Sequence, residues 1–394
     1  MRIGIAIDID PNKYKEIFTP NNWKILSENC KENAAPSVNT LILSYLKAGH
    51  YVRVFTLAKK NFSITSKNLN IIGVKRYNQY PIKYLWGIFY DGISLKKAIA
   101  NHIDDLDVLH AHWTYAYAYG ASFYEKKLPI FCTVRDWAPY IWKMESFKNK
   151  IFWSFKLIMN HIIFKHTKIH FIANSPYTAQ HIRKTYNLEV PIIPNSIHQS
   201  FVKLDQHVFP QKPIILCISS SNDKRKNIIS LLKAFLKFKE KYPNAVLQLI
   251  GAPFIPEDPI IKEWKKKQLL NQVQLIGKVN HQTLTKYIDQ ASMFVSPSLE
   301  ETFGNTFIES IARKLPVIGG KDSGAVPYVL HYGEAGFLCD VSNPIEICRT
   351  MEKIYENPLE AQSIANKAFS IILEEYNENT VSNQHINIYK KYCI

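Results

Sequence analysis

The 394-residue chain lacks the features that mark several large classes of protein. Its six cysteines form no CxxC pair and no Cys/His cluster, so we expect neither a zinc site nor a disulfide framework. They are Cys30, Cys132, Cys217, Cys339, Cys348 and Cys393. No apolar run approaches the roughly 20 residues that a membrane-spanning helix needs. The opening MRIGIAIDID has no apolar core or cleavage site of a signal peptide. These absences predict a cytosolic protein.

Acidic residues are scarce in the first half of the chain. Residues 1–200 hold 26 Lys and Arg against 13 Asp and Glu, whereas residues 201–394 hold 23 against 20. Within residues 51–100, nine basic residues accompany one acidic residue. A basic half can meet nucleic acid, an anionic membrane face or an acidic substrate, and it can also be a solvated surface without a partner.

Short apolar, β-branched runs alternate with amphipathic stretches along the whole chain. We expect strands in the first half at 2–8, 51–58, 107–113, 129–136, 170–175 and 190–196. Those in the second half are expected at 213–220, 245–251, 273–278, 293–298 and 316–320. This alternation predicts an α/β protein with two Rossmann-like, doubly wound parallel sheets.

The polar, aperiodic stretch 198–212 reads as a linker between two domains. We therefore expect an N-terminal domain over 1–200 and a C-terminal domain over 201–376. The segment 377–394 is predicted to be a helix that returns to the N-terminal domain. Ligands of such sheets bind beyond the carboxyl ends of the strands, here in a cleft between the domains.

The stretch EETFGNTFIES, residues 300–310, places a glycine, an amide and a hydroxyl between two carboxylates just before an apolar run. Gly304 allows a close turn, and a helix that starts there would leave its first backbone N–H groups unpaired. These groups belong to Asn305, Thr306 and Phe307. Such a helix start suits a phosphate or diphosphate. Glu309 inside the helix and Glu301 on the loop ahead would bind hydroxyls on either side of this anion.

The stretch therefore predicts a site for a nucleoside diphosphate sugar. The alternative is a solvated loop followed by a capped helix. The neighbouring Glu300 is expected to be solvated.

The longer segment SLEETFGNTFIESIARKLPVIGG resembles the E-x7-E signature of retaining, GT-B-fold glycosyltransferases of family 4, formerly called group 1. Other segments also resemble that family: LKAGHYVRVF (46–55), DVLHAHW (107–113), FIANSPYT (171–178), VPIIPNSI (190–197), KRKNIISLLKAF (224–235), YPNAVLQLIG (242–251) and KDSGAVPYVLHYGEAGFL (321–338). The resemblance covers most of the chain. It implies two Rossmann-like domains that face a central cleft, with the donor bound by the second domain.

The resemblance also implies roles for single residues on the donor side. Lys226 matches the lysine that neutralises the donor diphosphate, with Arg225 beside it, although Lys226 could also be a solvated lysine in a basic turn. Glu309 matches the acid that binds the ribose, and Glu301 matches the acid that orients the transferred sugar. The base pocket would be lined by the backbone at Gly251, Gly277 and Val279.

On the acceptor side, the resemblance implies that His112 faces the cleft from the first domain, together with Arg135 and Asp136. The alternative for His112 is a hydrogen-bonded core histidine. Arg135 departs from the family, because it stands where a histidine is usual. An arginine is a poor proton shuttle but a good bidentate partner for phosphate or carboxylate.

Three further departures from the family pattern bear on function. Ser221 stands where an arginine is common, and Lys224 or Arg225 could take over its role. Asn33-Ala34-Ala35 replaces a Gly-Gly loop, and Tyr328 replaces a common glutamate. No DxD motif appears where a metal-dependent transferase would need it, so we expect no metal and no cofactor.

The stretch 139–168 interleaves Trp, Phe, Ile and Lys in a helical pattern. Such a helix can lie in a membrane interface with its lysines toward anionic headgroups. It can equally be an ordinary amphipathic helix that packs on the sheet. If it binds a membrane, Trp142, Phe152 and Trp153 are the residues expected to insert.

The sequence thus predicts a retaining glycosyltransferase that moves a sugar from a nucleotide sugar, UDP-linked or GDP-linked, to a saccharide acceptor. A lipid-linked acceptor on the inner face of the cell membrane, as in capsule, O-antigen or exopolysaccharide assembly, fits the basic first half. Two alternatives stay open: a nucleotide-sugar epimerase of the same fold, and a non-enzymatic protein that binds nucleic acid. No recognised nucleic-acid motif accompanies the charge, so we expect no nucleic-acid partner.

Overall fold

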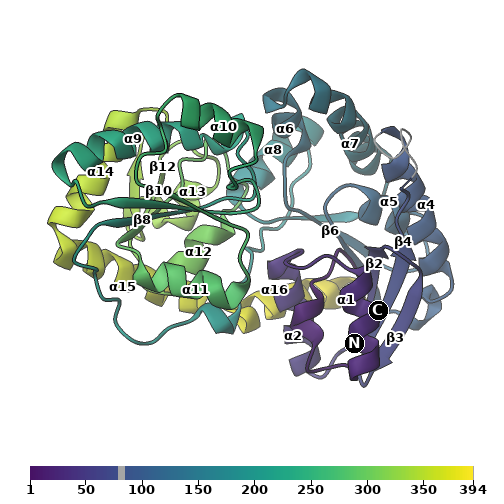
Figure 1. The fold of residues 1–394 in the computed structure, drawn as a ribbon. Coiled ribbons are helices and arrows are strands. Elements are labelled where there is room, and N and C mark those ends of the chain that lie inside the picture. The colour runs from purple at the N-terminus through teal and green to yellow at the C-terminus, as the bar shows by residue number, and fades with distance from the viewer. Residues whose placement is uncertain (79–84, 394) are drawn as a thin grey trace. The chain divides into compact units, whose positions relative to one another are not determined.

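The computed structural model describes residues 1–78 and 85–393 (Figure 1). Residues 79–84 of the basic stretch 51–100 and residue 394 of the terminal segment lie outside the described residues. The chain divides into two compact units. Unit 1 comprises Met1–Ser196 and Glu378–Ile394, and unit 2 comprises Ile197–Asn377.

Unit 1 is built on a sheet whose seven strands, within the described residues, run in the order β3-β4-β2-β1-β5-β6-β7. Their bounds are β1 Arg2–Ala6, β2 Tyr51–Ala58, β3 Phe62–Ser66, β4 Leu69–Lys75, β5 Val108–His112, β6 Ile130–Val134 and β7 His170–Ala173. Neighbouring strands are parallel except β3, which pairs with β4 in the antiparallel sense. The sheet is therefore parallel with one antiparallel edge.

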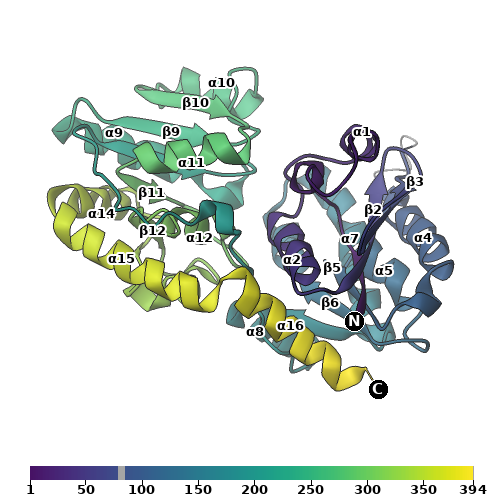
Figure 2. The same cartoon turned by 90° about the horizontal axis from the view of Figure 1, so that it is seen from below.

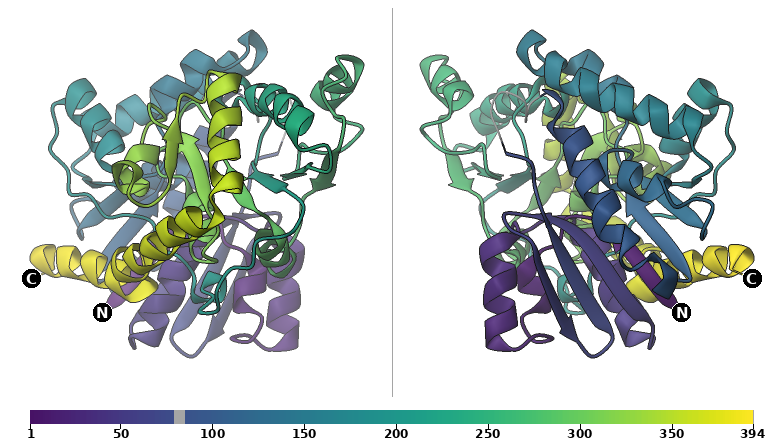
Figure 3. Two further views of the ribbon diagram at one scale, coloured as in Figure 1. Left: turned by 90° about the vertical axis from the view of Figure 1, so that its left-hand side faces the viewer. Right: turned by 90° about the vertical axis from the view of Figure 1, so that its right-hand side faces the viewer.

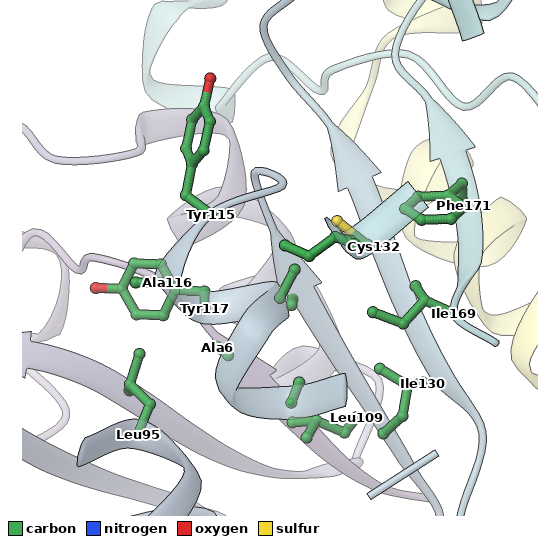
Figure 4. Close-up of a cluster of buried hydrophobic side chains, with 14 of the residues drawn as sticks. Ala6, Leu95, Leu109, Tyr115, Ala116, Tyr117, Ile130, Cys132, Ile169 and Phe171 are labelled. Atoms are coloured by element: carbon green, nitrogen blue, oxygen red, sulfur yellow. The ribbon is translucent and has the colours of Figure 1, made fainter. Parts of the chain in front are cut away.

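Helices cover both faces of this sheet (Figure 2). On one face lie α1 (Pro20–Asn29), α2 (Pro36–Lys47) and α16 (Glu378–Tyr392), which pack on strand residues such as Ile3 and Val54. On the other lie α4 (Gly87–Ala100), α5 (Ala116–Ser122), α7 (Phe147–His166) and α8 (Pro176–Tyr186). Figure 4 shows part of this second layer, in which Tyr117 and Leu95 belong to the same buried cluster as Leu109 and Ala6. The right-hand view of Figure 3 shows the blue helix α4 in front of the strands. Successive side chains of a strand point to opposite faces of the sheet, so the same strands contribute to the hydrophobic core on each face.

Unit 2 has a parallel sheet whose six strands, in the part of the chain described, run in the order β10-β9-β8-β11-β12-β13. Their bounds are β8 Ile214–Ile218, β9 Val246–Ile250, β10 Val273–Gly277, β11 Met293–Val295, β12 Val317–Gly320 and β13 Phe337–Cys339. One face carries α9 (Ile228–Lys241), α10 (Pro259–Lys266) and α14 (Pro344–Glu356) (Figure 1). The other carries α11 (His281–Gln290), α12 (Asn305–Ile311), α13 (Val326–Val329) and α15 (Pro358–Glu375).

These two sheets confirm the predicted fold class, and most of the expected strands are present. The prediction was wrong at 190–196, where only Ile192 pairs with the sheet, through a single bridge to Ala173. Pro191 and Pro194 lack the N–H groups that a strand would donate. Strands β3, β4 and β13 were not predicted.

The stretch 139–168 is not one helix. It forms α6 (Ala138–Met144) and α7, which are separated at Glu145 and Ser146. Within the described residues, no helix is both long enough and apolar enough to cross a membrane.

Candidate active site

The expected donor residues of unit 2 follow four adjacent strands of its sheet. Strands β10, β9, β8 and β11 are neighbours in that order and run parallel. Their carboxyl ends therefore lie along one edge, which is where ligands of such sheets bind. Gly277 ends β10, Gly251 follows β9, and Lys226 comes a few residues after β8. The stretch from Ser296 to Gly304 follows β11.

Lys226 lies at this edge and is 9% exposed. It ends a short 3-10 helix, Lys224–Lys226, whose start is capped by Asp223. Asp223 accepts a hydrogen bond from the backbone N–H of Lys226 at 3.2 Å. Ser221, which stands in the place of the family's arginine, donates to the same carboxylate at 2.7 Å. Ser221 therefore helps to shape the turn that presents Lys226.

The Lys226 ammonium donates to Glu301 Oε1 at 2.5 Å. The sequence predicted both residues at the donor site but not their contact. Burial raises the pKa of the Glu301 carboxyl, but the charges of Lys226 and Arg225 and hydrogen bonds from Lys226 and Ser298 outweigh it, so the pKa lies below its usual range. Glu301 is therefore charged at neutral pH and holds the lysine in one orientation.

Glu300 is buried, at 2% exposure, so its predicted solvation is wrong. Its carboxylate lies 3.5 Å from Nη1 of Arg225, and its backbone carbonyl accepts from the same nitrogen at 3.2 Å. Leu299 in turn donates its backbone N–H to the carbonyl of Arg225 at 2.8 Å. Arg225 thus fastens the turn after β8 to the loop after β11.

Gly304 precedes α12 with a φ of 93°, a left-handed conformation that favours glycine. A Cβ there would lie 2.8 Å from the ring of Phe307. The helix begins at Asn305, as predicted, but it ends at Ile311 and has only seven residues. Its macrodipole is correspondingly small.

The prediction that the backbone N–H of Phe307 is unpaired and binds an anion is wrong, because this N–H donates to the carbonyl of Gly304 at 3.0 Å. Its side chain is fully buried and packs against Phe294. Asn305, Thr306 and Glu309 are half-buried on the same helix, with Glu309 about one turn after its start.

The expected base-pocket glycines adjoin each other. Gly251 donates its N–H to the carbonyl of Gly277 at 2.9 Å. Gly251 has a φ of 147°, and a Cβ there would lie 1.8 Å from the carbonyl of Ser219, so only glycine fits. Val279 packs partly buried against the core on the α11 face. Gly251 and Gly277 thus lie at the carboxyl ends of β9 and β10, and the contact of Gly251, Gly277 and Val279 with a base stays a prediction.

In unit 1, Arg135 follows β6 and lies beside His112, which ends β5. Its Nε donates to Nδ1 of His112 at 3.1 Å. Its Nη1 donates to Ser37 Oγ at 3.1 Å and to Asn195 Oδ1 at 2.5 Å. Ser37 is the second residue of α2, and Asn195 lies in the segment that follows α8. One guanidinium thus connects three segments of unit 1.

A buried polar cluster lies beneath this guanidinium. His110 contacts the hydroxyl of Tyr389 at 2.5 Å and that of Thr133 at 2.8 Å. Tyr389, on α16, also contacts the hydroxyl of Tyr45 at 3.0 Å. The ring of His112 is 4.2 Å from that of His110. The last helix of the chain, α16, therefore contributes Tyr389 to the buried polar cluster beside Arg135.

Asp136 points elsewhere, although it adjoins Arg135 in the sequence. It accepts a hydrogen bond from the hydroxyl of Tyr115 at 2.9 Å. The ammonium of Lys156 lies 4.8 Å from the Tyr115 ring and 4.1 Å from the Trp153 ring. Burial lowers the pKa of Lys156, and Asp136 partly opposes that change. Asp136 and Arg135 are therefore neighbouring but separate features.

The loop Asn33-Ala34-Ala35 takes the place of two glycines and still adopts left-handed conformations. The φ values are 57° at Asn33 and 40° at Ala35. The side chain of Asn39 donates to the carbonyls of Ala34 and Ala35 at 2.8 and 2.9 Å. Side-chain hydrogen bonds thus hold a backbone that glycine would adopt without strain.

The sequence reasoning missed several residues of these sites. They are Ser37, Asn39, His110, Asn195, Asp223 and Tyr389. His110 and Asn195 lay in the quoted segments DVLHAHW and VPIIPNSI, but their partners are distant in the sequence. Among the described residues, no group of three His, Cys, Asp or Glu side chains is arranged to hold a metal ion.

Comparison with known proteins defines the class. The family model described as "Glycosyl transferases group 1" matches residues 201–370, and the model described as "Glycosyltransferase Family 4" matches residues 34–201. Sucrose-phosphate synthase from Thermosynechococcus elongatus superimposes with a TM-score of 0.76 at 16% identity, over 99% of this chain and 98% of that one. Anabaena HepE in complex with UDP-glucose gives 0.71 at 14% identity, over 99% and 100%. The fold is GT-B, the fold of these glycosyltransferases.

The chain belongs to the group 1 glycosyltransferases of family 4, because the two models together match most of both units. It is 25% identical over 294 residues to trehalose synthase from Pyrococcus horikoshii, covering 68% of this chain and 64% of that protein. It is 32% identical over 96 residues to alpha-monoglucosyldiacylglycerol synthase from Acholeplasma laidlawii, covering 24% of each. The match thus spans less than two-thirds of either relative.

Proposed function

We propose that the protein transfers a sugar from a nucleoside diphosphate sugar to a saccharide acceptor with retention of anomeric configuration. The observation that carries this proposal is the Lys226–Glu301 pair at the carboxyl edge of the unit 2 sheet. A lysine ammonium has three N–H donors, so one can bind Glu301 while the others bind the donor diphosphate. The family membership supports the proposal, as do the solved structures of HepE with UDP and with UDP-glucose.

In this mechanism the bond between the anomeric carbon and the diphosphate oxygen breaks, and the acceptor oxygen bonds to the same face of that carbon. The proton of the acceptor hydroxyl passes to the leaving diphosphate. Negative charge grows on the diphosphate as this happens, and Lys226 and Arg225 stabilise it. Both cations are held in place before the donor arrives, Lys226 by Glu301 and Arg225 by Glu300. Charge stabilisation of this kind is effective because the groups need not reorganise during the reaction.

Proton NMR of the first product tests the reaction. The protein is incubated with UDP-glucose or GDP-mannose, alone and with candidate saccharide acceptors, and the anomeric signal is followed from the earliest time points. The proposal predicts a product with the anomeric configuration of the donor. An inverted anomer would contradict retention, and epimerised nucleotide sugar without transfer would favour an epimerase. Lys226→Ala should transfer far less sugar, whereas the control Lys241→Ala, which removes an exposed lysine that pairs with Glu356, should transfer like the wild type.

We further propose that the acceptor is lipid-linked and that unit 1 rests on an anionic membrane. Exposed apolar side chains lie on two helices that are joined by a contact of Trp86 with Phe155. On α7, Phe147 is 85% exposed, Ile151 50% and Ile158 52%. At about 100° per residue, these three lie within about 40° of one another around the helix. Trp86 and Tyr90, at the start of α4, extend the same exposed set, which we call the α4–α7 apolar patch.

The residues first expected to insert are poorly placed to do so. Trp142 donates its indole N–H to Ser154 at 2.9 Å, and Trp153 packs against the core of unit 1. Phe152 has the ammonium of Lys156 over its ring at 5.2 Å. The α4–α7 apolar patch therefore replaces them as the proposed insertion site.

Vesicle sedimentation tests the membrane proposal. The protein should sediment with anionic but not with neutral vesicles, and Phe147→Glu with Ile151→Glu should release it. Leu359→Glu, at an 88% exposed leucine of unit 2, is the control and should bind like the wild type. Equal recovery of the wild type from anionic and neutral vesicles would contradict the proposal.

A further inference from the structure

Asp8 follows β1 at the carboxyl edge of the unit 1 sheet, and its carboxylate is held through one oxygen only. Arg76 donates from Nη2 to Oδ1 at 2.8 Å, and the hydroxyl of Tyr117 donates to the same oxygen at 2.6 Å. The Tyr117 hydroxyl is itself fixed, because it accepts from the backbone N–H of Leu57 at 3.0 Å. Within the described residues Oδ2 has no hydrogen-bond partner, and the Asp8 side chain is 34% exposed. One carboxylate oxygen is thus oriented by the protein, while the other is open to a ligand.

Trp113 lies beside Asp8 at the same edge. Strands β1 and β5 pair in parallel, with Ala6 opposite Ala111. Asp8 and Trp113 each come two residues after that pair, so they adjoin at the strand ends. The Trp113 side chain is partly buried and packs against the hydrophobic cores on both faces of the sheet, so it lies across the strand ends. In the part of the chain that the structure describes, its indole N–H has no hydrogen-bond partner and is therefore available to a ligand.

The backbone of Trp113 is strained. Its φ is 63°, a left-handed conformation that is an outlier for a bulky residue. Its N–H still donates to the carbonyl of Thr133 at 3.1 Å, so the strain falls where β5 ends and not in a free loop. Glycine would adopt this conformation without cost, so the indole is held here against the preference of the backbone. Strained residues of this kind cluster at ligand-binding sites.

The charges around Asp8 favour an uncharged ligand. Asp91, on α4, is 8% exposed. Burial raises the pKa of Asp91 to about 6, although a backbone hydrogen bond from Tyr77 and the charge of Arg76 oppose this change, so its carboxyl is mostly charged at pH 7. Burial acts to lower the pKa of the Arg76 guanidinium, but Asp8 and Asp91 outweigh it, so that pKa lies above its usual range. One cation shared by two carboxylates has no positive charge to spare for an anion, whereas a hydroxyl group can donate to Asp8.

We propose that Asp8 and Trp113 bind an uncharged sugar ring of the saccharide acceptor, with Oδ2 of Asp8 accepting from one sugar hydroxyl and the Trp113 indole donating to a neighbouring sugar oxygen. This inference rests on the proposed function and names two residues that bind its acceptor. A hydroxyl that donates to a carboxylate makes a charge-assisted hydrogen bond, about twice as strong as one between neutral groups. Neighbouring sugar hydroxyls can each donate and accept, so one ring can satisfy both residues. Arg76 and Tyr117 act as positioning residues, because they orient Asp8 through its other oxygen.

Ligand-observed NMR titration of the full chain tests the proposal. The probes are the methyl glycosides of glucose, galactose, mannose and N-acetylglucosamine, each with and without UDP. Any glycoside that binds is then compared with its deoxy analogues, each of which lacks one hydroxyl. The variants are Asp8→Asn, which keeps the shape but removes the charge, and Trp113→Phe, which keeps a ring but removes the N–H. The matched control is Asp104→Asn, at an exposed aspartate of the same unit that pairs with Lys127.

The wild type should bind at least one glycoside, and removal of one particular hydroxyl should weaken that binding about tenfold or more. Asp8→Asn should weaken the parent glycoside by a similar factor and should no longer distinguish it from that deoxy analogue, because the same hydrogen bond is already lost. A purely structural role of Asp8 would leave this discrimination in place. Trp113→Phe should weaken binding about two- to tenfold and become insensitive to a different deoxygenation. Asp104→Asn should bind like the wild type, and circular dichroism checks that each variant is folded.

The inference is overturned if none of the four glycosides binds the wild type. It is also overturned if Asp8→Asn binds the parent glycoside like the wild type or still discriminates against the same deoxy analogue. Should Asp8→Asn fail to fold, Trp113→Phe decides alone, and wild-type affinity in that variant overturns the inference. Failure of the proposed function looks different: neither UDP nor GDP would bind and no sugar would be transferred, while the glycoside titrations would still decide the role of Asp8.

Discussion

Removal of the Lys226 charge should destabilise unit 2 because it leaves Glu301 as a buried carboxylate. The two side chains are 11% and 17% exposed, and their atoms meet at 2.5 Å. Loss of one partner from a buried ion pair costs about 3–5 kcal/mol. Since both side chains keep some contact with water, we expect Lys226→Ala to lower the free energy of unfolding by about 2–3 kcal/mol at pH 7.

The effect should depend on pH in a defined direction. In the wild type the pKa of Glu301 is lowered, so its contribution to stability is present above its unfolded pKa and is lost as pH falls through the folded value. Burial is the largest influence on this pKa and Lys226 the largest one opposing it, so the pKa should rise in Lys226→Ala. The difference in stability between wild type and variant should therefore shrink as pH falls from 7 toward 4.

Urea unfolding of the full chain between pH 4 and pH 8 measures the difference in stability between the wild type and Lys226→Ala. The double variant Lys226→Ala with Glu301→Gln should recover much of the lost stability, since no buried charge remains unpaired. Lys241→Ala, which breaks an exposed pair with Glu356, should show no measurable change. A Lys226→Ala variant as stable as Lys241→Ala, with no rescue by Glu301→Gln, would refute the reasoning.

Three further predictions concern the donor, metals and the loop before α2. Glu309→Gln should weaken binding of a nucleoside diphosphate by about 1.5–3 kcal/mol through lost hydrogen bonds to ribose, and calorimetry with unchanged affinity would contradict it. Transfer should continue in EDTA, and a complete loss that Mn²⁺ or Mg²⁺ restores would reveal a metal site. Ala35→Gly should raise the free energy of unfolding by up to about 1 kcal/mol by relieving a left-handed alanine. Ala48→Gly, at a residue with a φ of −76°, should lower it in the same urea titration.

The sequence predicted the strands that a local pattern of apolar residues marks. The apolar runs that became β8, β11 and β12 were recognised because burial makes these strands continuously hydrophobic. The hairpin of β3 and β4 was missed because it mixes polar and apolar residues in a basic stretch. It turns at Lys67, which has a φ of 46°. β13, which is three residues long, was missed as well.

The site residues divide in the same way, into those that a local sequence pattern predicts and those whose contacts depend on distant parts of the chain. Gly304, Glu301 and Glu309 were predicted from one contiguous stretch, and Lys226 from the resemblance of the separate segment KRKNIISLLKAF. The burial of Glu300 depends on Arg225, which lies 75 residues earlier in the chain. The partners of Arg135 lie 98 and 60 residues away, at Ser37 and Asn195. Only the folded sheet, which brings its strand ends together, makes such contacts visible.

The most direct test of the central claim is a calorimetric titration of wild type and Lys226→Ala with uridine, UDP, guanosine and GDP. The claim is that Lys226 binds a donor diphosphate at the carboxyl edge of the unit 2 sheet. It predicts that UDP or GDP binds the wild type at least about tenfold more tightly than its nucleoside, and that this difference largely disappears in Lys226→Ala. Equal affinity of the wild type for nucleoside and diphosphate would contradict the claim, as would a diphosphate preference that survives in the variant.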